Sequence, residues 1–184
     1  MNIESLYRIA ALVTLSALMG ACSSMEWSAS RIDSESDEAL VVFQEQINGA
    51  EVFLNQAAGF LVFPRALRAG FGIGAETGEG ALRVGGKTVD YMRITSGSIG
   101  LQAGAQARSI VIAFMTQSAL EQFRNSNGWR VGIDGSVALI DIGAGKTIDS
   151  QNVRDPVVGF IFGSAGLMAN LTLEGTRFTR INRE

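Results

Sequence analysis

The first part of the chain carries apolar residues at every third or fourth position, which is the spacing of one face of an α-helix. The positions on this face are Leu40, Phe43, Ile47, Ala50, Leu54 and Ala57. Ser34 or Ser36 can cap the helix, and Asn48-Gly49 is expected to divide it into two. The polar face carries Glu and Gln rather than Lys and Arg, so the pattern favours core packing over a membrane-surface helix.

After Pro64 the apolar residues alternate with polar or small ones, and glycine-rich turns separate the segments. Strands are expected over residues 70–75, 80–84, 98–107, 129–142 and 171–180. A further helix is expected over residues 117–124, capped by Thr116. Gly and Ala recur at alternate strand positions, which suits a tightly curved sheet. The predicted class is α+β, with N-terminal amphipathic helices packed on a glycine-rich, mainly antiparallel, strongly curved or barrel-like sheet.

The N-terminal segment has the pattern that is typical of an export signal. Residues 9–19 form an apolar run that follows Arg8 and is too short to cross a bilayer. Residues 18–22 (LMGAC) resemble the bacterial lipobox, in which the cysteine receives a diacylglycerol before cleavage. An ordinary secretory signal that leaves Cys22 as a free thiol is the alternative. We expect a signal peptide at residues 1–21, a lipidated tether at 22–33 and one domain at 34–184. Ser23 after the cysteine favours the outer membrane, with the domain facing the periplasm.

Composition excludes several kinds of chemistry. The chain has 184 residues, one cysteine and no histidine, so disulfides, cysteine metal clusters and histidine-based catalysis are not expected. Net charge is −3 and the pI is near 5.1, which argues against nucleic-acid binding. No motif singles out an acidic pair for catalysis, and no phosphate-binding loop is complete. We therefore expect no enzyme activity, no cofactor and no metal.

Basic residues near Pro64 are the candidates for contact with anionic lipid headgroups, which Arg and Lys recognise. They are Arg65, Arg68, Arg83, Lys87 and Arg93. Glu76, Glu79 and Asp90 are interleaved with them, so the sequence alone leaves open whether the positive charges converge or form an ordinary solvated face.

Five ordered motifs resemble the SYLF domain family, over about residues 39–180. They are residues 58–64 (AGFLVFP), 70–74 (GFGIG), 98–104 (SIGLQAG), 129–134 (WRVGID) and 166–175 (GLMANLTLEG). The resemblance implies a lipid-binding domain, and it makes Arg65 and Arg68 the first candidates for headgroup contact. Eukaryotic relatives bind phosphoinositides, and some bind actin. Here the first helix is acidic and actin is absent from the periplasm, so actin is not an expected partner.

The sequence therefore predicts a non-catalytic module that is anchored through lipidated Cys22 and binds a phospholipid. The alternative is a structural or interaction lipoprotein that holds a protein partner of the cell envelope.

Overall fold

The computed structural model describes residues 27–141, 155–166 and 172–183. Cys22 and the signal segment lie outside these residues, so the predicted signal and lipidation are not tested by it. The elements are α2 (Ala29–Gln46), α3 (Ala50–Gln56), β1 (Gly59–Val84), β2 (Lys87–Phe114), α4 (Gln117–Asn125), β3 (Trp129–Arg130), β4 (Ala138–Asp141), β5 (Val157–Gly166) and β6 (Arg177–Ile181).

The first helix begins earlier than the sequence pattern predicted. Ser28 caps α2, and its side chain accepts a hydrogen bond from the Arg31 backbone N–H at 3.3 Å. Ser36 is fully buried inside the helix, so the predicted cap at Ser34 or Ser36 was wrong. Residues 29–33, which the sequence pattern places in the tether, therefore belong to the helix.

The other helix predictions hold. The chain leaves the helical conformation between Gln46 and Ala50, which confirms the predicted break at Asn48-Gly49. Thr116 caps α4 by accepting a hydrogen bond from the Ala119 backbone N–H at 3.2 Å, as predicted.

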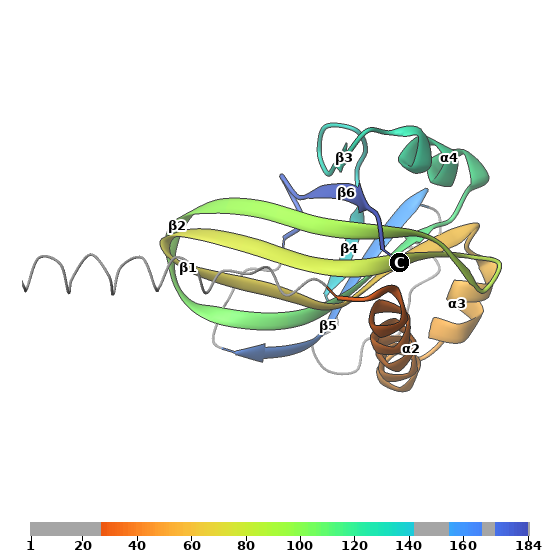
Figure 1. Cartoon of the computed structure of the whole chain (residues 1–184), viewed down its shortest axis with the longest axis horizontal. Helices are drawn as coiled ribbons and strands as arrows, with labels where there is room; N and C mark the ends of the chain where they lie inside the picture. The colour runs from red at the N-terminus through yellow and green to blue at the C-terminus, as the bar shows by residue number, and fades with distance from the viewer. Residues whose placement is uncertain (1–26, 142–154, 167–171, 184) are drawn as a thin grey trace, which may run out of the picture.

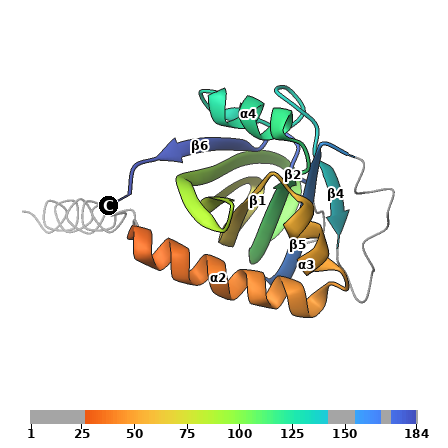
Figure 2. The same ribbon diagram turned by 90° about the vertical axis from the view of Figure 1, so that its right-hand side faces the viewer.

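One long hairpin dominates the sheet. β1 and β2 pair antiparallel along nearly their whole length, from Gly59 opposite Phe114 to Val84 opposite Lys87. Among the described residues the sheet has six strands in the order β3-β6-β2-β5-β4, with β1 on β2; β4 and β5 pair parallel, and the other strand pairs are antiparallel. Figure 2 shows the hairpin curling into a trough, with α2 across one side and α4 above the other. The predicted α+β class with a strongly curved, mainly antiparallel sheet is confirmed.

The hairpin folds back on itself at residues 70–74, at the end of the molecule that lies opposite α3 and α4 (Figure 1). A Cβ atom at Gly70 would lie 2.5 Å from the Gly74 Cα, which shows how sharply β1 bends. Beyond the bend, the second half of β1 passes under the first half. A Cβ atom at Gly78 would lie 2.8 Å from the carbonyl oxygen of Arg65. A Cβ atom at Gly80 would overlap the carbonyl oxygen of Val62. Only glycine permits backbones to pack this closely.

Two apolar clusters occupy the two faces of the sheet. The space inside the folded hairpin is filled from both of its halves, by residues that include Phe63, Ile94 and Ile112, and Phe178 of β6 packs among them. On the outer face, Phe43 of α2 and Phe53 of α3 both pack edge-on against Phe160 of β5, with ring centroids 5.1 and 5.0 Å apart. The amphipathic helices are thus part of the core, as their polar faces suggested.

A buried ion pair joins the two layers of the hairpin near the bend. Arg108 Nε and Nη2 donate to the two carboxylate oxygens of Glu76 at 2.6 and 2.7 Å, and both side chains are at most 1% exposed. Ser96 donates to the same carboxylate at 3.2 Å. Such a bidentate pair is strongly directional, so it fixes how the layers stack.

Several strand predictions were wrong in extent. Residues 70–75 and 80–84 form parts of one strand, β1, which begins at Gly59, before Pro64. The segment 129–142 is interrupted, because Gly132 takes a φ of +85° in a turn between β3 and β4, and Ile133 is 65% exposed instead of facing the core. In the segment 171–180, regular pairing covers only Arg177–Ile181 of β6 among the described residues.

Replacing Gly80 with Ala is expected to destabilise the fold, because the new methyl group would overlap the backbone of the first half of β1. Overpacking of this kind costs about 1–3 kcal/mol or more. Gly97→Ala is the matched control, because a Cβ atom at Gly97 meets nothing within 4 Å. Urea unfolding measures both variants, and equal free energies of unfolding would contradict the close packing.

Candidate functional site

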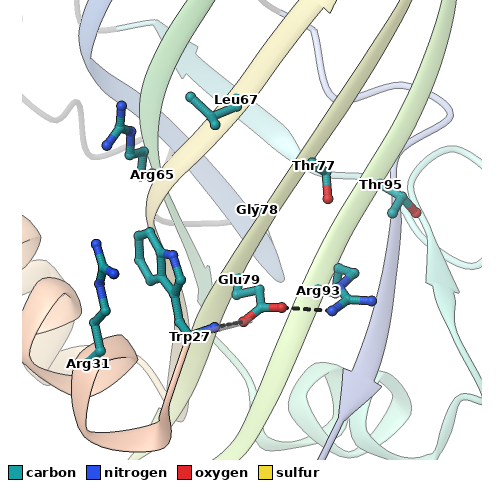
Figure 3. Close-up of a pocket in the computed structure, with 9 residues that line it drawn as sticks. All are labelled: Trp27, Arg31, Arg65, Leu67, Thr77, Gly78, Glu79, Arg93 and Thr95. Atoms are coloured by element: carbon teal, nitrogen blue, oxygen red, sulfur yellow. Dashed lines mark hydrogen bonds and ion pairs between the residues drawn. The ribbon is translucent and has the colours of Figure 1, made fainter. Parts of the chain in front are cut away.

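A pocket of about 570 Å³ opens where the start of α2 meets the two crossing halves of β1. Its walls combine arginines, one carboxylate, one indole and small polar residues. They are Trp27, Arg31, Arg65, Leu67, Thr77, Gly78, Glu79, Arg93 and Thr95 (Figure 3). The tight crossing at Gly78 brings residues 65–67 over residues 77–79, so the pocket is a product of the folded hairpin.

Trp27 and Arg31 reach the pocket from the N-terminal turn of α2. The Arg31 guanidinium carbon lies 4.6 Å from the centroid of the Trp27 ring, a cation–π contact. The Arg31 side chain also lies 3.5 Å from Glu35 one helical turn later. The Trp27 backbone N–H donates to Glu79 at 3.3 Å and so ties the start of the helix to the sheet.

Glu79 is the carboxylate of the pocket, and two arginines neutralise it. Arg93 lies directly opposite on β2 and donates to Glu79 Oε1 at 2.7 Å. Arg183 donates through Nε at 3.2 Å and makes a second, closer contact through Nη2. Burial alone would raise the pKa of Glu79, but the hydrogen bonds from Arg183 and Arg93 outweigh it and lower the pKa below the usual 4.5.

Arg65 differs from its neighbours because its side chain is exposed and makes no hydrogen bond or ion pair within residues 27–141, 155–166 and 172–183. In Figure 3 its guanidinium lies on the same side of the Trp27 indole as that of Arg31, whereas the Glu79–Arg93 pair lies on the other side. Among the described residues that line the pocket, three are arginines, Arg31, Arg65 and Arg93, and one, Glu79, is a carboxylate.

The five basic residues singled out from the sequence do not converge. Arg65 and Arg93 line the pocket. Arg83 lies near the other end of the hairpin and pairs with Asp37 at 2.8 Å. Lys87 is exposed beside the Gly85-Gly86 turn. Arg68 is 5% exposed and lies within the folded hairpin, so it does not present its side chain at the surface.

Sequence reasoning missed three residues of this arrangement. Trp27 and Arg31 were assigned to the tether, although buried Ile32 continues the apolar face of the helix four positions before Ser36. Arg183 comes from the end of the chain, 104 positions from Glu79, and no local pattern could have connected the two.

The arrangement suits binding of a small anionic group that carries an apolar portion. Arginines can take a phosphate or carboxylate through their forked N–H donors, while Trp27 and Leu67 offer apolar surface. Within the part of the chain that the structure describes, no three acidic or cysteine side chains are grouped to hold a metal ion. No helix there has both the length and the apolar character to cross a bilayer.

Comparison with known families tests the resemblance. Residues 95–184 match the Ysc84 family, described as Las17-binding protein actin regulator. This is the family of the SYLF domain. Residues 95–184 therefore match the SYLF domain family, as the sequence motifs predicted. SYLF domains form a family of binding domains, which agrees with a non-catalytic binding module. No curated protein matches the chain.

Acidification is expected to weaken the link between Glu79 and its two arginines. Because the folded pKa of Glu79 is lowered, its contribution to stability is present above about pH 4.5 and is lost as the pH falls through the lowered value. Glu79→Gln should therefore be less stable than the unmodified protein at pH 6, with a smaller difference at pH 3.

Urea unfolding at the two pH values measures this difference. Glu38→Gln is the control, because Glu38 is exposed on α2. A gap between Glu79→Gln and the unmodified protein that stays constant from pH 6 to pH 3 would contradict the assigned role of the carboxylate.

Proposed function

We propose that this SYLF protein is a non-catalytic, lipid-anchored module of the outer membrane, facing the periplasm, that binds anionic phospholipid headgroups. The observation that carries the proposal is Arg65, which is exposed and makes no ion pair with the described part of the chain. It lies beside Arg31, Trp27 and Leu67 in a pocket whose described lining has three arginines and one carboxylate. Anchoring through Cys22 rests on the lipobox-like segment at residues 18–22.

The filled interior favours headgroup recognition over enclosure of an acyl chain. Apolar side chains from both halves of the hairpin occupy the space between its layers. The pocket instead opens at the surface, where the arginines lie. A ligand there would keep its acyl chains outside the protein, as a phospholipid that remains in its bilayer does.

The acidic character of α2 is compatible with this proposal, because part of its charge serves the fold. Asp33 accepts hydrogen bonds from Thr88 at 2.7 Å and Tyr91 at 2.9 Å, and Asp37 pairs with Arg83. These carboxylates hold the helix to the hairpin. Cations for the headgroup come from Arg65 on β1 and from Arg31 at the start of the helix.

The description of the matched family names actin regulation, but we do not propose this role for the present chain. The signal peptide predicted at residues 1–21 would deliver the chain to the periplasm, which has no actin. A lipid surface is available to a periplasmic protein, so lipid binding is the property that we carry over.

Removing the Arg65 charge is expected to weaken binding to vesicles that contain phosphatidylglycerol by about fivefold, because each Arg near an anionic surface contributes about 1 kcal/mol. Flotation of residues 23–184 at low salt measures the loss in Arg65→Ala. Lys87→Ala is the matched control, since it removes the same charge outside the pocket.

The binding should also fall as salt is raised, because exposed charges are screened over about 10 Å at 0.1 M. If the unmodified protein does not float at low salt, headgroup binding is wrong. If it does not float and crosslinking instead recovers one envelope protein, the alternative role as an interaction lipoprotein is favoured.

Changing Cys22 to Ser is expected to abolish lipidation, so that the protein no longer fractionates with membranes. Mass spectrometry of the N-terminal peptide checks the modification directly in the unmodified chain. Ser24→Ala, two positions after the cysteine, should leave the lipid in place. A mature N-terminus with a free Cys22 thiol would show that the signal is an ordinary secretory one.

A further inference from the structure

The bend of the β1–β2 hairpin exposes large apolar side chains to an unusual degree. Phe71 is 89% exposed, Ile73 is 73% exposed and Ile99 is 89% exposed. Ile73 and Ile99 are direct cross-strand partners, and Phe71 lies two residues away on β1. We refer to Phe71, Ile73 and Ile99 as the apolar tip. Exposed apolar groups of this kind mark contact sites for another molecule or a membrane.

The tip is also free of charge over an unusual length of chain. Residues 69–75 and 94–107 contain no Asp, Glu, Lys or Arg. The charged residues that bound the first stretch, Arg68 and Glu76, are buried. A soluble surface of this size normally includes charged side chains, and their absence removes the main cost of entering a hydrocarbon layer.

Most backbone polar groups on both sides of the bend have a cross-strand partner, which favours entry into hydrocarbon. Cross-strand pairing flanks the bend on both sides, with Gly70 opposite Gly104, Phe71 opposite Ala103 and Gly74 opposite Ser98, while Gly72 and residues 100–102 have no partner in the β1–β2 register. The register shifts once, between Phe71 and Ile73. Backbone polar groups must be satisfied internally inside a bilayer, and a paired hairpin meets most of this requirement.

The position of the tip relative to the proposed anchor decides what it contacts. Trp27 lies five residues after Cys22, so the intervening chain spans at most about 18 Å. Trp27 shares the pocket with Leu67, and Phe71 lies four residues further along β1, about 13 Å in an extended strand. A lipid on Cys22 therefore holds the pocket, and with it the bend, close to a membrane surface.

We propose that the apolar tip inserts into the leaflet that carries the Cys22 lipid, while Trp27 and Arg65 lie at the headgroup level. The inference rests on the proposed anchor. Trp and Arg are residues that favour the boundary between hydrocarbon and water. Insertion gives the domain one orientation on the membrane, with α3 and α4 directed away from it (Figure 1).

A second copy of the chain is a poorer fit for the tip. Stable protein interfaces bury about 800 Å² on each partner, from some 20–30 residues. The tip presents three large apolar side chains on one narrow bend. A bilayer needs no complementary shape, so it can cover so small a projection.

The experiment uses the full chain, expressed with its own signal and reconstituted into vesicles of phosphatidylcholine alone. Phe71→Cys introduces a thiol at the tip for an environment-sensitive nitrobenzoxadiazole dye, and the lipid on Cys22 blocks the only native thiol. Val52→Cys is the matched control, because Val52 is a 61% exposed apolar residue on α3, at the opposite end of the molecule.

The dye at position 71 is expected to shift to shorter wavelength with a several-fold rise in emission, and spin-labelled lipids should quench it. The dye at position 52 should show neither effect. Adding Ile73→Asp and Ile99→Asp to Phe71→Cys should abolish the shift. An unshifted dye at position 71 in anchored protein overturns insertion, and so does an equal shift at both positions.

Neutral vesicles separate this result from headgroup binding, which needs anionic lipid and Arg65. If the dye at position 71 shows insertion but Arg65→Ala does not weaken flotation, the headgroup proposal is wrong and the insertion proposal stands. An unmodified Cys22 in the mass spectrum would overturn the anchor, and the inference with it. A shift in soluble residues 23–184 without vesicles, together with a doubled mass, would assign the tip to self-association instead.

Discussion

The backbones of the two halves of β1 cross almost in contact, and most other features of the molecule depend on this crossing. Gly78 and Gly80 lie directly beneath residues 62–66, where any side chain would meet backbone atoms. Nearer the bend, the Arg108–Glu76 pair bridges the same two layers with two short hydrogen bonds. The glycines let the layers approach, and the buried pair specifies how they align. Because an unpaired buried charge costs several kcal/mol, alternative stackings that separate Arg108 from Glu76 are strongly disfavoured.

The crossing creates two surfaces with different chemistry. Inside, apolar side chains fill the hairpin. Outside, the crossing at Gly78 sets Arg65 and Leu67 above Glu79 and Arg93, and the start of α2 adds Trp27 and Arg31. The pocket is thus made from residues that are distant in sequence. Arg93 and Arg183 both donate to its carboxylate, whereas Arg65 makes no ion pair with the described residues and is exposed.

The acidic residues of helix α2 contribute to the fold, so their charge says little about whether the protein binds a membrane. The helix contains five acidic residues and one basic residue, which argues against its lying on an anionic bilayer. Two of the carboxylates, Asp33 and Asp37, are occupied by hairpin partners. The Asp33 contact has a visible electrostatic effect, since burial and the neighbouring carboxylate raise the pKa of Tyr91. The helix is therefore docked by its charges and by Phe43, and the proposed membrane contacts come from the hairpin.

Local patterns determined the class of fold, the break at Asn48-Gly49, the capped helix after Thr116 and the curved, glycine-rich sheet, because each depends on neighbours along the chain. The same patterns identified Arg65 and Arg93 as basic residues near a corner. They could not separate these two from buried Arg68, paired Arg83 or distant Lys87, since a charge in a sequence does not reveal its partners. Only the folding of the hairpin decided that, by bringing positions 65 and 78 together and by placing Arg183 beside Glu79. Long-range contacts of this kind have no periodicity that a single sequence can display.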